Sequence, residues 1–237
     1  MSVIWHDIEC GAYGADLYLW RSLAREHREP LLDVGAGTGR IALELAGDGH
    51  RVVALDHDPV LIAELSRRAA GLEIETVVAD AREFELGRRF GLIIVPMQTI
   101  QLLGGTSGRA RFLERARRHL EAGGLVAIAI SEQLELYEAD AGHGAPLPDI
   151  RELEGVVYSS QPTAVRQDHG GFVLERRRET IDGGGLRSVE QDVIRIDALT
   201  AGELEREGEA AGLTPAGRTE VAPTADHVGS VVVMLRA

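Results

Sequence analysis

The chain has 237 residues, a length typical of one ordinary domain that can bury a sizeable core. Its formal net charge is −13, and all 25 of its basic residues are arginine. This charge argues against nucleic acid as a partner, because clustered Lys and Arg are what hold a phosphate backbone. The absence of lysine also excludes chemistry on a lysine amine, such as a Schiff base.

The sequence contains few signals of where in the cell the protein is found. Cys10 is the one cysteine, so no disulfide can form within the chain. The sequence has no apolar run of about 18 residues and no N-terminal signal pattern. We therefore expect a cytoplasmic protein with no membrane partner, and we expect no metal site.

A glycine-rich turn at residues 31–40 is the most informative stretch. An apolar run ends there in Gly35, Gly37 and Gly39, and a helical pattern follows at once. Glycine lets the backbone turn sharply and approach a ligand closely, and the next helix directs its unpaired N–H groups into the same crevice. The arrangement suits a nucleotide-like ligand at the carboxyl end of a parallel strand. The alternative is a tight strand-to-helix turn that binds nothing.

Acidic residues close the next two apolar segments. Asp56 follows residues 51–55, where its carboxylate can accept hydrogen bonds from both hydroxyls of a ribose. Asp80 follows residues 75–79. A fourth apolar strand, a helix, a Gly-Gly turn and a fifth strand come next, at residues 90–96, 112–120, 123–124 and 125–130.

The pattern Asp33-x-Gly35-x-Gly37-x-Gly39 resembles motif I of the class I S-adenosylmethionine-dependent methyltransferases, and the likeness extends over residues 31–131. A dinucleotide fingerprint would instead have its third glycine at the position of Arg40. The resemblance implies S-adenosyl-L-methionine (SAM) as cofactor and S-adenosylhomocysteine (SAH) as product. It places the cofactor against Asp33, Gly35, Ala36, Gly37, Asp56, His57, Asp80, Ala81 and Pro96. Residues 96–99 read Pro-Met-Gln-Thr, which lacks the Asn-Pro-Pro-Tyr motif of methyltransferases that act on DNA bases.

The expected fold is α/β, with a doubly wound, mainly parallel seven-stranded Rossmann-like sheet. Continuous Val/Ile/Leu strands alternate with helices, which predicts a sheet covered on both faces. Thr200 and Glu203 predict a capping box at the start of a late helix. Strands at 213–221 and 228–235 resemble the terminal hairpin of the family, with a reversed last strand. The strand order 3-2-1-4-5 is implied by the resemblance.

An insertion interrupts this alternation of strands and helices. Residues 138–149 read as a polar loop, and β-like segments at 155–165, 171–181 and 186–196 predict a small antiparallel sheet. We therefore divide the chain into an N-terminal helical lid (1–30), a SAM-binding core (31–131 and 198–237) and a β insertion (132–197). In the family such an insertion forms a lid or a dimer surface, so the sequence leaves open whether two copies of the chain form a homodimer. A purely stabilising appendage is the alternative.

Aromatic side chains gather before the glycine loop, in a chain with only 4% aromatic residues. This segment resembles the N-terminal helix of a bacterial small-molecule methyltransferase subgroup. Tyr13 and Trp20 are candidate cofactor contacts and Tyr18 a candidate acceptor contact, and packing on the sheet is the alternative for each. Gln98 and Gln101 resemble an acceptor-lining run of that subgroup, although Gln98 stands where the subgroup has Asn.

The predicted function is transfer of a methyl group from SAM to the nitrogen or oxygen of a small molecule. His6 and His227 are the candidate general bases, since histidine titrates in the right range. One alternative is a SAM-binding sensor or partner domain without turnover. Another is a nicotinamide-dependent oxidoreductase, against which Arg40 and the terminal hairpin argue. The sequence does not identify the acceptor.

Overall fold

The computed structural model describes residues 3–139, 146–224 and 227–237, which divide into two compact units. The first unit comprises residue 3 together with residues 13–132 and 199–237, and the second comprises residues 4–12 and 133–198. The N-terminal segment, which we expected to be one lid, is shared between them. Nearly all of helix α1 (Val3–Cys10) belongs to the second unit, and helix α2 (Leu17–Glu26) belongs to the first.

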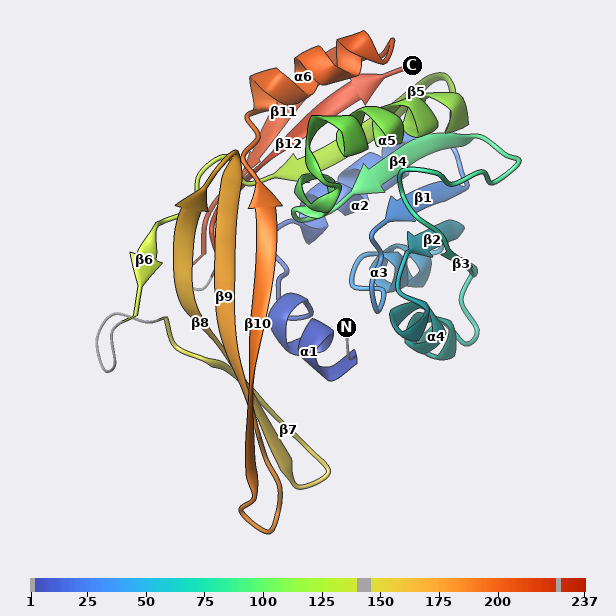
Figure 1. Ribbon diagram of the computed structural model, residues 1–237. Coiled ribbons are helices and arrows are strands. Elements are labelled where there is room, and N and C mark those ends of the chain that lie inside the picture. The colour runs from blue at the N-terminus through green and yellow to red at the C-terminus, as the bar shows by residue number, and fades with distance from the viewer. Residues whose placement is uncertain (1–2, 140–145, 225–226) are drawn as a thin grey trace. The chain divides into compact units, whose positions relative to one another are not determined.

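A seven-stranded sheet forms the centre of the first unit, in the order β11-β12-β5-β4-β1-β2-β3 (Figure 1). Strand β12 runs antiparallel to both of its neighbours, and the remaining pairs are parallel. The predicted doubly wound fold, its strand order and its reversed last strand are thus confirmed. The strands are β1 (Leu31–Val34), β2 (Val52–Asp56), β3 (Ile74–Val78), β4 (Phe90–Val95), β5 (Leu120–Ile130), β11 (Thr214–Val221) and β12 (Ser230–Arg236).

Helices cover both faces of this sheet because successive strand residues point to opposite sides. Leu32 and Val34 of β1 face the core under α5 (Gly105–His119) and α6 (Ala201–Ala210). Leu31 faces the other core, under α2, α3 (Ala42–Gly47) and α4 (Pro59–Arg68). Among the described residues, no helix is both long and apolar enough to cross a membrane.

Local sequence signals explain several helix boundaries. The Thr200–Glu203 capping box at the start of α6 is confirmed. Helix α5 starts at Gly105, before the apolar pattern that led us to expect a start at 112, because its first turns are small and polar. Gly108 is required in those turns, since a Cβ there would lie 1.8 Å from the carbonyl oxygen of Leu103, at the end of the 3₁₀ helix η1 (Thr99–Leu102).

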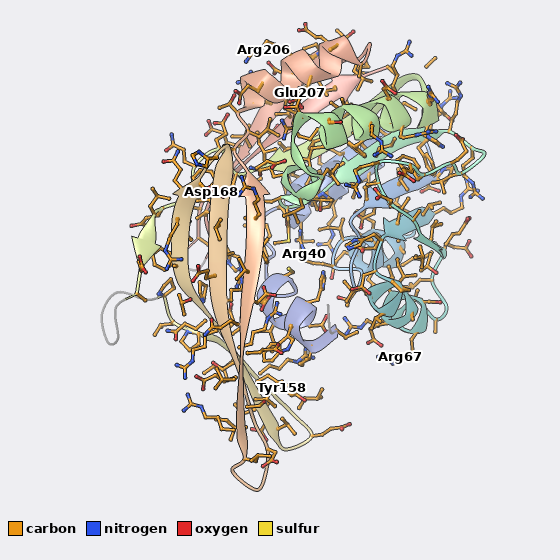
Figure 2. All side chains as sticks on the ribbon, viewed as in Figure 1. Arg40, Arg67, Tyr158, Asp168, Arg206 and Glu207 are labelled. Atoms are coloured by element: carbon orange, nitrogen blue, oxygen red, sulfur yellow. The ribbon has the colours of Figure 1, made fainter. Side chains whose placement is uncertain are left out.

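An ion pair joins the two helices on one face of the sheet. Arg109 of α5 donates to both carboxylate oxygens of Glu207 of α6, at 2.8 and 2.7 Å. Figure 2 labels Glu207 on its helix. Because the pair is largely buried and bidentate, it fixes the two helices relative to each other.

The second unit is built on an antiparallel sheet of five strands in the order β10-β9-β8-β6, with β7 paired to β8 (Figure 1). Two of its strands fall at the ends of the predicted loop, of which residues 140–145 lie outside the described part. Trp5 and Glu9 of α1 pack on this sheet, Trp5 edge to face with Tyr158 at 5.5 Å. The strands are β6 (Tyr137–Glu138), β7 (Asp149–Leu153), β8 (Val156–Asp168), β9 (Gly171–Ile181) and β10 (Arg187–Asp197).

Candidate functional site

The glycine loop follows β1 as the sequence predicts. Gly35, Gly37 and Gly39 have φ angles of 75°, 55° and 98°, in the left-handed region that favours glycine. The N–H groups of Gly35 and Ala36 both donate to the carbonyl oxygen of Leu55, at 2.8 and 3.0 Å. The loop is therefore fastened to the carboxyl end of the neighbouring strand β2.

Two of these glycines are needed for packing within the protein. A Cβ on Gly35 would lie 2.5 Å from Cγ2 of Thr99, and a Cβ on Gly39 would lie 2.3 Å from Cδ1 of Leu65 on α4. Gly35 thus lets the loop approach the turn after β4, and Gly39 lets the chain pass close to α4.

Asp56, at the end of β2, holds the middle of the loop. One carboxylate oxygen accepts the N–H of Gly37 at 2.8 Å, and the other accepts the N–H of Asp58 at 2.9 Å. A carboxylate has about four acceptor positions, so Asp56 keeps capacity for further donors. His57 lies beside it, with Nδ1 3.2 Å from the Asp56 carboxylate and its side chain 85% exposed.

Asp33 carries a buried carboxylate. Its side chain lies in β1, and neither oxygen makes a hydrogen bond within the described residues. Burial raises the pKa of Asp33 to about 7, against the opposing charge of Arg40. An unpaired buried carboxylate is costly, so a cation or a hydrogen-bond donor beside Asp33 would stabilise its charged form.

Asp80 and Ala81 follow β3, in the first unit. Sequence reasoning did not foresee that Arg82 engages the Asp80 carboxylate with its guanidinium, at 2.6 and 2.9 Å. These hydrogen bonds lower the pKa of Asp80 to about 2. Ala81 is buried, as is Pro96 at the end of β4.

Arg40, labelled in Figure 2, connects the glycine loop to the N-terminal segment. Its guanidinium pairs with both oxygens of Asp16, at 2.6 and 2.8 Å, and donates to the carbonyl oxygen of Tyr13 at 2.9 Å. The indole N–H of Trp20 donates to the same Asp16 carboxylate at 2.8 Å. Trp20 has no exposed surface. Its burial in the core gives no support to the expected cofactor contact.

A small cavity of the first unit brings together predicted residues that are far apart in the chain. The rings of Tyr13 and His227 lie 4.9 Å apart on one side of it. The Tyr13 hydroxyl is buried without a hydrogen bond in the described part of the chain, and burial raises its pKa. The cavity is lined by Tyr13, Asp16, Met97, Gln98, His227, Val228 and Ser230.

The backbone at this cavity is strained. Met97 follows Pro96 and has a φ of 55°, which a side chain with a Cβ rarely adopts. Such strain persists where the surroundings enforce it and is common at functional sites.

The remaining candidates lie elsewhere. Gln101 is buried and exchanges two hydrogen bonds with the backbone of Ser131, at 3.1 and 2.8 Å, which secures the end of β5. Its burial gives no support to the expected place in an acceptor-lining wall. Tyr18 is 79% exposed, and His6 lies on α1 in the second unit. No cluster of three metal-ligating side chains occurs in the described ranges.

Residues 31–124 match the model of the family described as "Methyltransferase domain". Among curated proteins, the chain is 28% identical over 127 residues to the cypemycin N-terminal methyltransferase of Streptomyces sp, covering 53% of this chain and 52% of that protein. The chain spans about half to two thirds of the length of the curated relatives it matches.

Solved structures share the fold over nearly the whole chain. The sugar N-methyltransferase KedS8 from Streptoalloteichus superposes with a TM-score of 0.75 at 20% identity, covering 98% of this chain and 91% of that one. SAM-bound CalS10, an amino pentose methyltransferase from Micromonospora echinaspora, superposes with a TM-score of 0.73 at 20% identity, covering 99% and 97%.

Proposed function

We propose that this chain, whose residues 31–124 match the family described as "Methyltransferase domain", binds SAM as a class I methyltransferase and transfers its methyl group to a small-molecule acceptor. One observation supports this proposal above the others. Asp33 is a buried carboxylate without a hydrogen-bond partner in the described chain, beside a glycine loop that Asp56 holds in place.

The residues of the first unit fit the chemical groups of SAM. Asp33 suits the ammonium group at the amino-acid end, because a nearby cation would stabilise its charged form. Asp56 retains acceptor capacity for ribose hydroxyls. Asp80, Ala81 and the exposed His57 suit the adenine ring. Bound SAM would supply a methyl group that its sulfonium has already activated.

Residues of the cavity would then handle the acceptor. Tyr13, Gln98 and His227 line it and offer a hydroxyl, an amide and an imidazole for hydrogen bonding. Alignment of a nucleophile with the methyl group can lower a barrier by about 7–11 kcal/mol, so positioning is their main task. We prefer His227 to His6 as the group that takes the acceptor's proton, because His227 lines this cavity.

Nitrogen is the acceptor atom that we favour. The names of the cypemycin N-terminal methyltransferase and of the sugar N-methyltransferase KedS8 both specify it. An amine that arrives neutral needs no strong base, which agrees with a site that offers a single imidazole.

Calorimetric titration of the purified protein with SAM, SAH and NAD in parallel tests the proposal. We expect micromolar affinity for SAM and SAH and no heat with NAD. Binding of NAD alone would contradict the proposal and favour an oxidoreductase. SAM binding without turnover of any amine, amino sugar or hydroxylated metabolite would favour a sensor or partner domain.

A further inference from the structure

We propose that Arg82 is a positioning residue that holds the Asp80 carboxylate ready to recognise the 6-amino group of adenine. The inference rests on the proposed function, because it assumes that the adenine of SAM lies against Asp80. It assigns a role in cofactor selection to a residue that no motif of the sequence singled out.

The hydrogen bonds of Asp80 leave little freedom to its carboxylate. Oδ1 accepts the backbone N–H of Arg82 at 2.8 Å and Nε of the same residue at 2.9 Å. Oδ2 accepts Nη2–H at 2.6 Å and shares the Nε–H at 3.1 Å. Three N–H groups therefore serve a carboxylate that has about four acceptor positions, which leaves capacity for one further donor. The Asp80 side chain is 33% exposed, so a ligand can reach this carboxylate.

Arg82 is itself held by the segment that leads into α5. Its Nη1 lies 3.5 Å from the carbonyl oxygen of Leu103. The Arg82 side chain passes close to Gly104 and Gly108, since a Cβ at these positions would lie 3.9 Å from Nη1 and 3.5 Å from Cδ, within ordinary van der Waals contact. The guanidinium therefore spans from the β3–β4 connection to the turn before α5, and its rigid fork fixes the plane of the carboxylate.

The charge state of Asp80 follows from this arrangement. The Arg82 hydrogen bonds lower the pKa of Asp80 to about 2, so the carboxylate is ionised at neutral pH. An ionised carboxylate only accepts hydrogen bonds. It can accept an N–H of the adenine amino group, whereas it repels the carbonyl oxygen that a 6-oxopurine carries at the same position. A 6-oxopurine would therefore leave the carboxylate without a hydrogen-bond donor, and such a loss discriminates strongly between two ligands.

The test is a calorimetric comparison of two ligands, SAH and S-inosylhomocysteine, in which a 6-oxo group replaces the amino group. We expect Arg82→Ala to weaken SAH binding about tenfold or more and to reduce the preference for SAH over the 6-oxo analogue. Arg82→Lys keeps the charge without the fork and should fall between. Arg88→Ala is the matched control, because Arg88 makes an exposed ion pair with Glu75 of β3 at 2.8 Å. This variant should bind both ligands as the wild type does.

A double-mutant cycle separates positioning from stability. If Arg82 acts through Asp80, then Arg82→Ala should cost little in a chain that already carries Asp80→Ala. Unchanged affinity and preference in Arg82→Ala would overturn the inference, as would an equal loss of both ligands accompanied by a lower melting temperature. If the wild type binds neither ligand, the proposed function fails first, and the role of Arg82 fails with it.

Discussion

Arg40 and Asp16 form a bidentate ion pair, with N···O distances of 2.6 and 2.8 Å and side chains that are only 9% and 2% exposed. Arg40 comes directly after the glycine loop, and Asp16 precedes helix α2. The pair therefore fixes the segment that carries Tyr13 to the loop that carries the candidate cofactor contacts.

Arg40→Ala should lower the free energy of unfolding by about 3–5 kcal/mol, because it leaves the Asp16 carboxylate buried without its cation. Urea denaturation measures the loss. Arg21→Ala is the control, since Arg21 makes exposed ion pairs with Glu44 and Asp48, which are worth at most about 1 kcal/mol. Equal losses in the two variants would contradict the special role of the buried pair.

Asp33→Asn should remove a pH dependence of stability. The pKa of Asp33 is about 7 in the folded chain, against an ordinary value of 3.8, so the folded state binds the proton more tightly. The wild type should lose stability as the pH rises from about 4 to about 7, by up to the order of 4 kcal/mol. The variant should lack this slope, and its melting temperature should exceed that of the wild type most at pH 8.

The same variant tests the role of Asp33 in binding. An amide cannot pair with an ammonium group as a carboxylate does, so Asp33→Asn should bind SAH more weakly at pH 8. A stabilised variant with unchanged SAH affinity would exclude Asp33 from the cofactor site.

If the proposed function holds, Asp56→Ala should weaken SAH binding about a hundredfold or more, since it would remove a charged acceptor from two ribose hydroxyls, with each hydrogen bond worth about 1.5–3 kcal/mol. It also frees the N–H of Gly37 that holds the loop. Calorimetry gives the affinity. Asp58→Ala is the comparison, because Asp58 caps helix α4 and its loss should cost about 1 kcal/mol of stability without a change in affinity.

Arg178→Met should destabilise the second unit by about 3–5 kcal/mol. Arg178 donates to both carboxylate oxygens of buried Glu9, at 2.7 and 2.8 Å. Burial alone would raise the pKa of Glu9, but the hydrogen bonds and charge of Arg178, the charge of Arg176 and the hydrogen bond from Ser160 together outweigh it and keep the pKa below its usual range. Adding Glu9→Gln should recover much of the loss in a urea titration. A double variant no more stable than Arg178→Met would show that the lost packing of the Arg178 side chain, and not the unpaired Glu9 carboxylate, causes the destabilisation.

Gly39→Ala should be more destabilising than Gly71→Ala. Both glycines have a positive φ, 98° and 84°, so both substitutions carry the strain of a left-handed alanine. Only at Gly39 does the new Cβ also meet Leu65, whereas nothing lies within 4 Å at Gly71. Overpacking should add about 1–3 kcal/mol at Gly39. Equal melting temperatures of the two variants would mean that α4 can shift away from the new Cβ without loss of stability.

The sheet of the first unit was predictable because its strands are buried on both faces. β1, β2 and β4 are buried along their full length and therefore appear as mainly apolar runs, with Asp33 the polar residue inside β1 and Asp56 the last residue of β2. β7 has five exposed residues and no apolar alternation, so nothing in its sequence distinguishes it from a loop. The start of α5 was missed for a similar reason, since its first two turns lack an apolar stripe.

The arrangement of the candidate site was predictable where its residues lie at or directly after the end of a strand. Asp56 and Gly37 meet because parallel strands end at one edge of the sheet. The partners of long side chains were not predictable: the hydrogen bonds of Arg82 to Asp80 depend on a flexible stem, which leaves no periodic signal. Trp20 shows a further limit, because an aromatic side chain has the same sequence signature in a core as in a ligand pocket.

The Glu9–Arg178 pair also bears on the order in which the chain assembles. Its two residues lie 169 positions apart, whereas β8, β9 and β10 are joined by short hairpin turns. Closing a long loop costs entropy before its contacts form, so local hairpins precede distant contacts in folding. We therefore expect α1 to dock after the sheet has formed and to detach first under mild denaturation. Detachment would leave the hairpins paired and would expose the face of the sheet that α1 covers, where the Ser160 hydroxyl of β8 donates to Glu9 at 2.7 Å, to proteases.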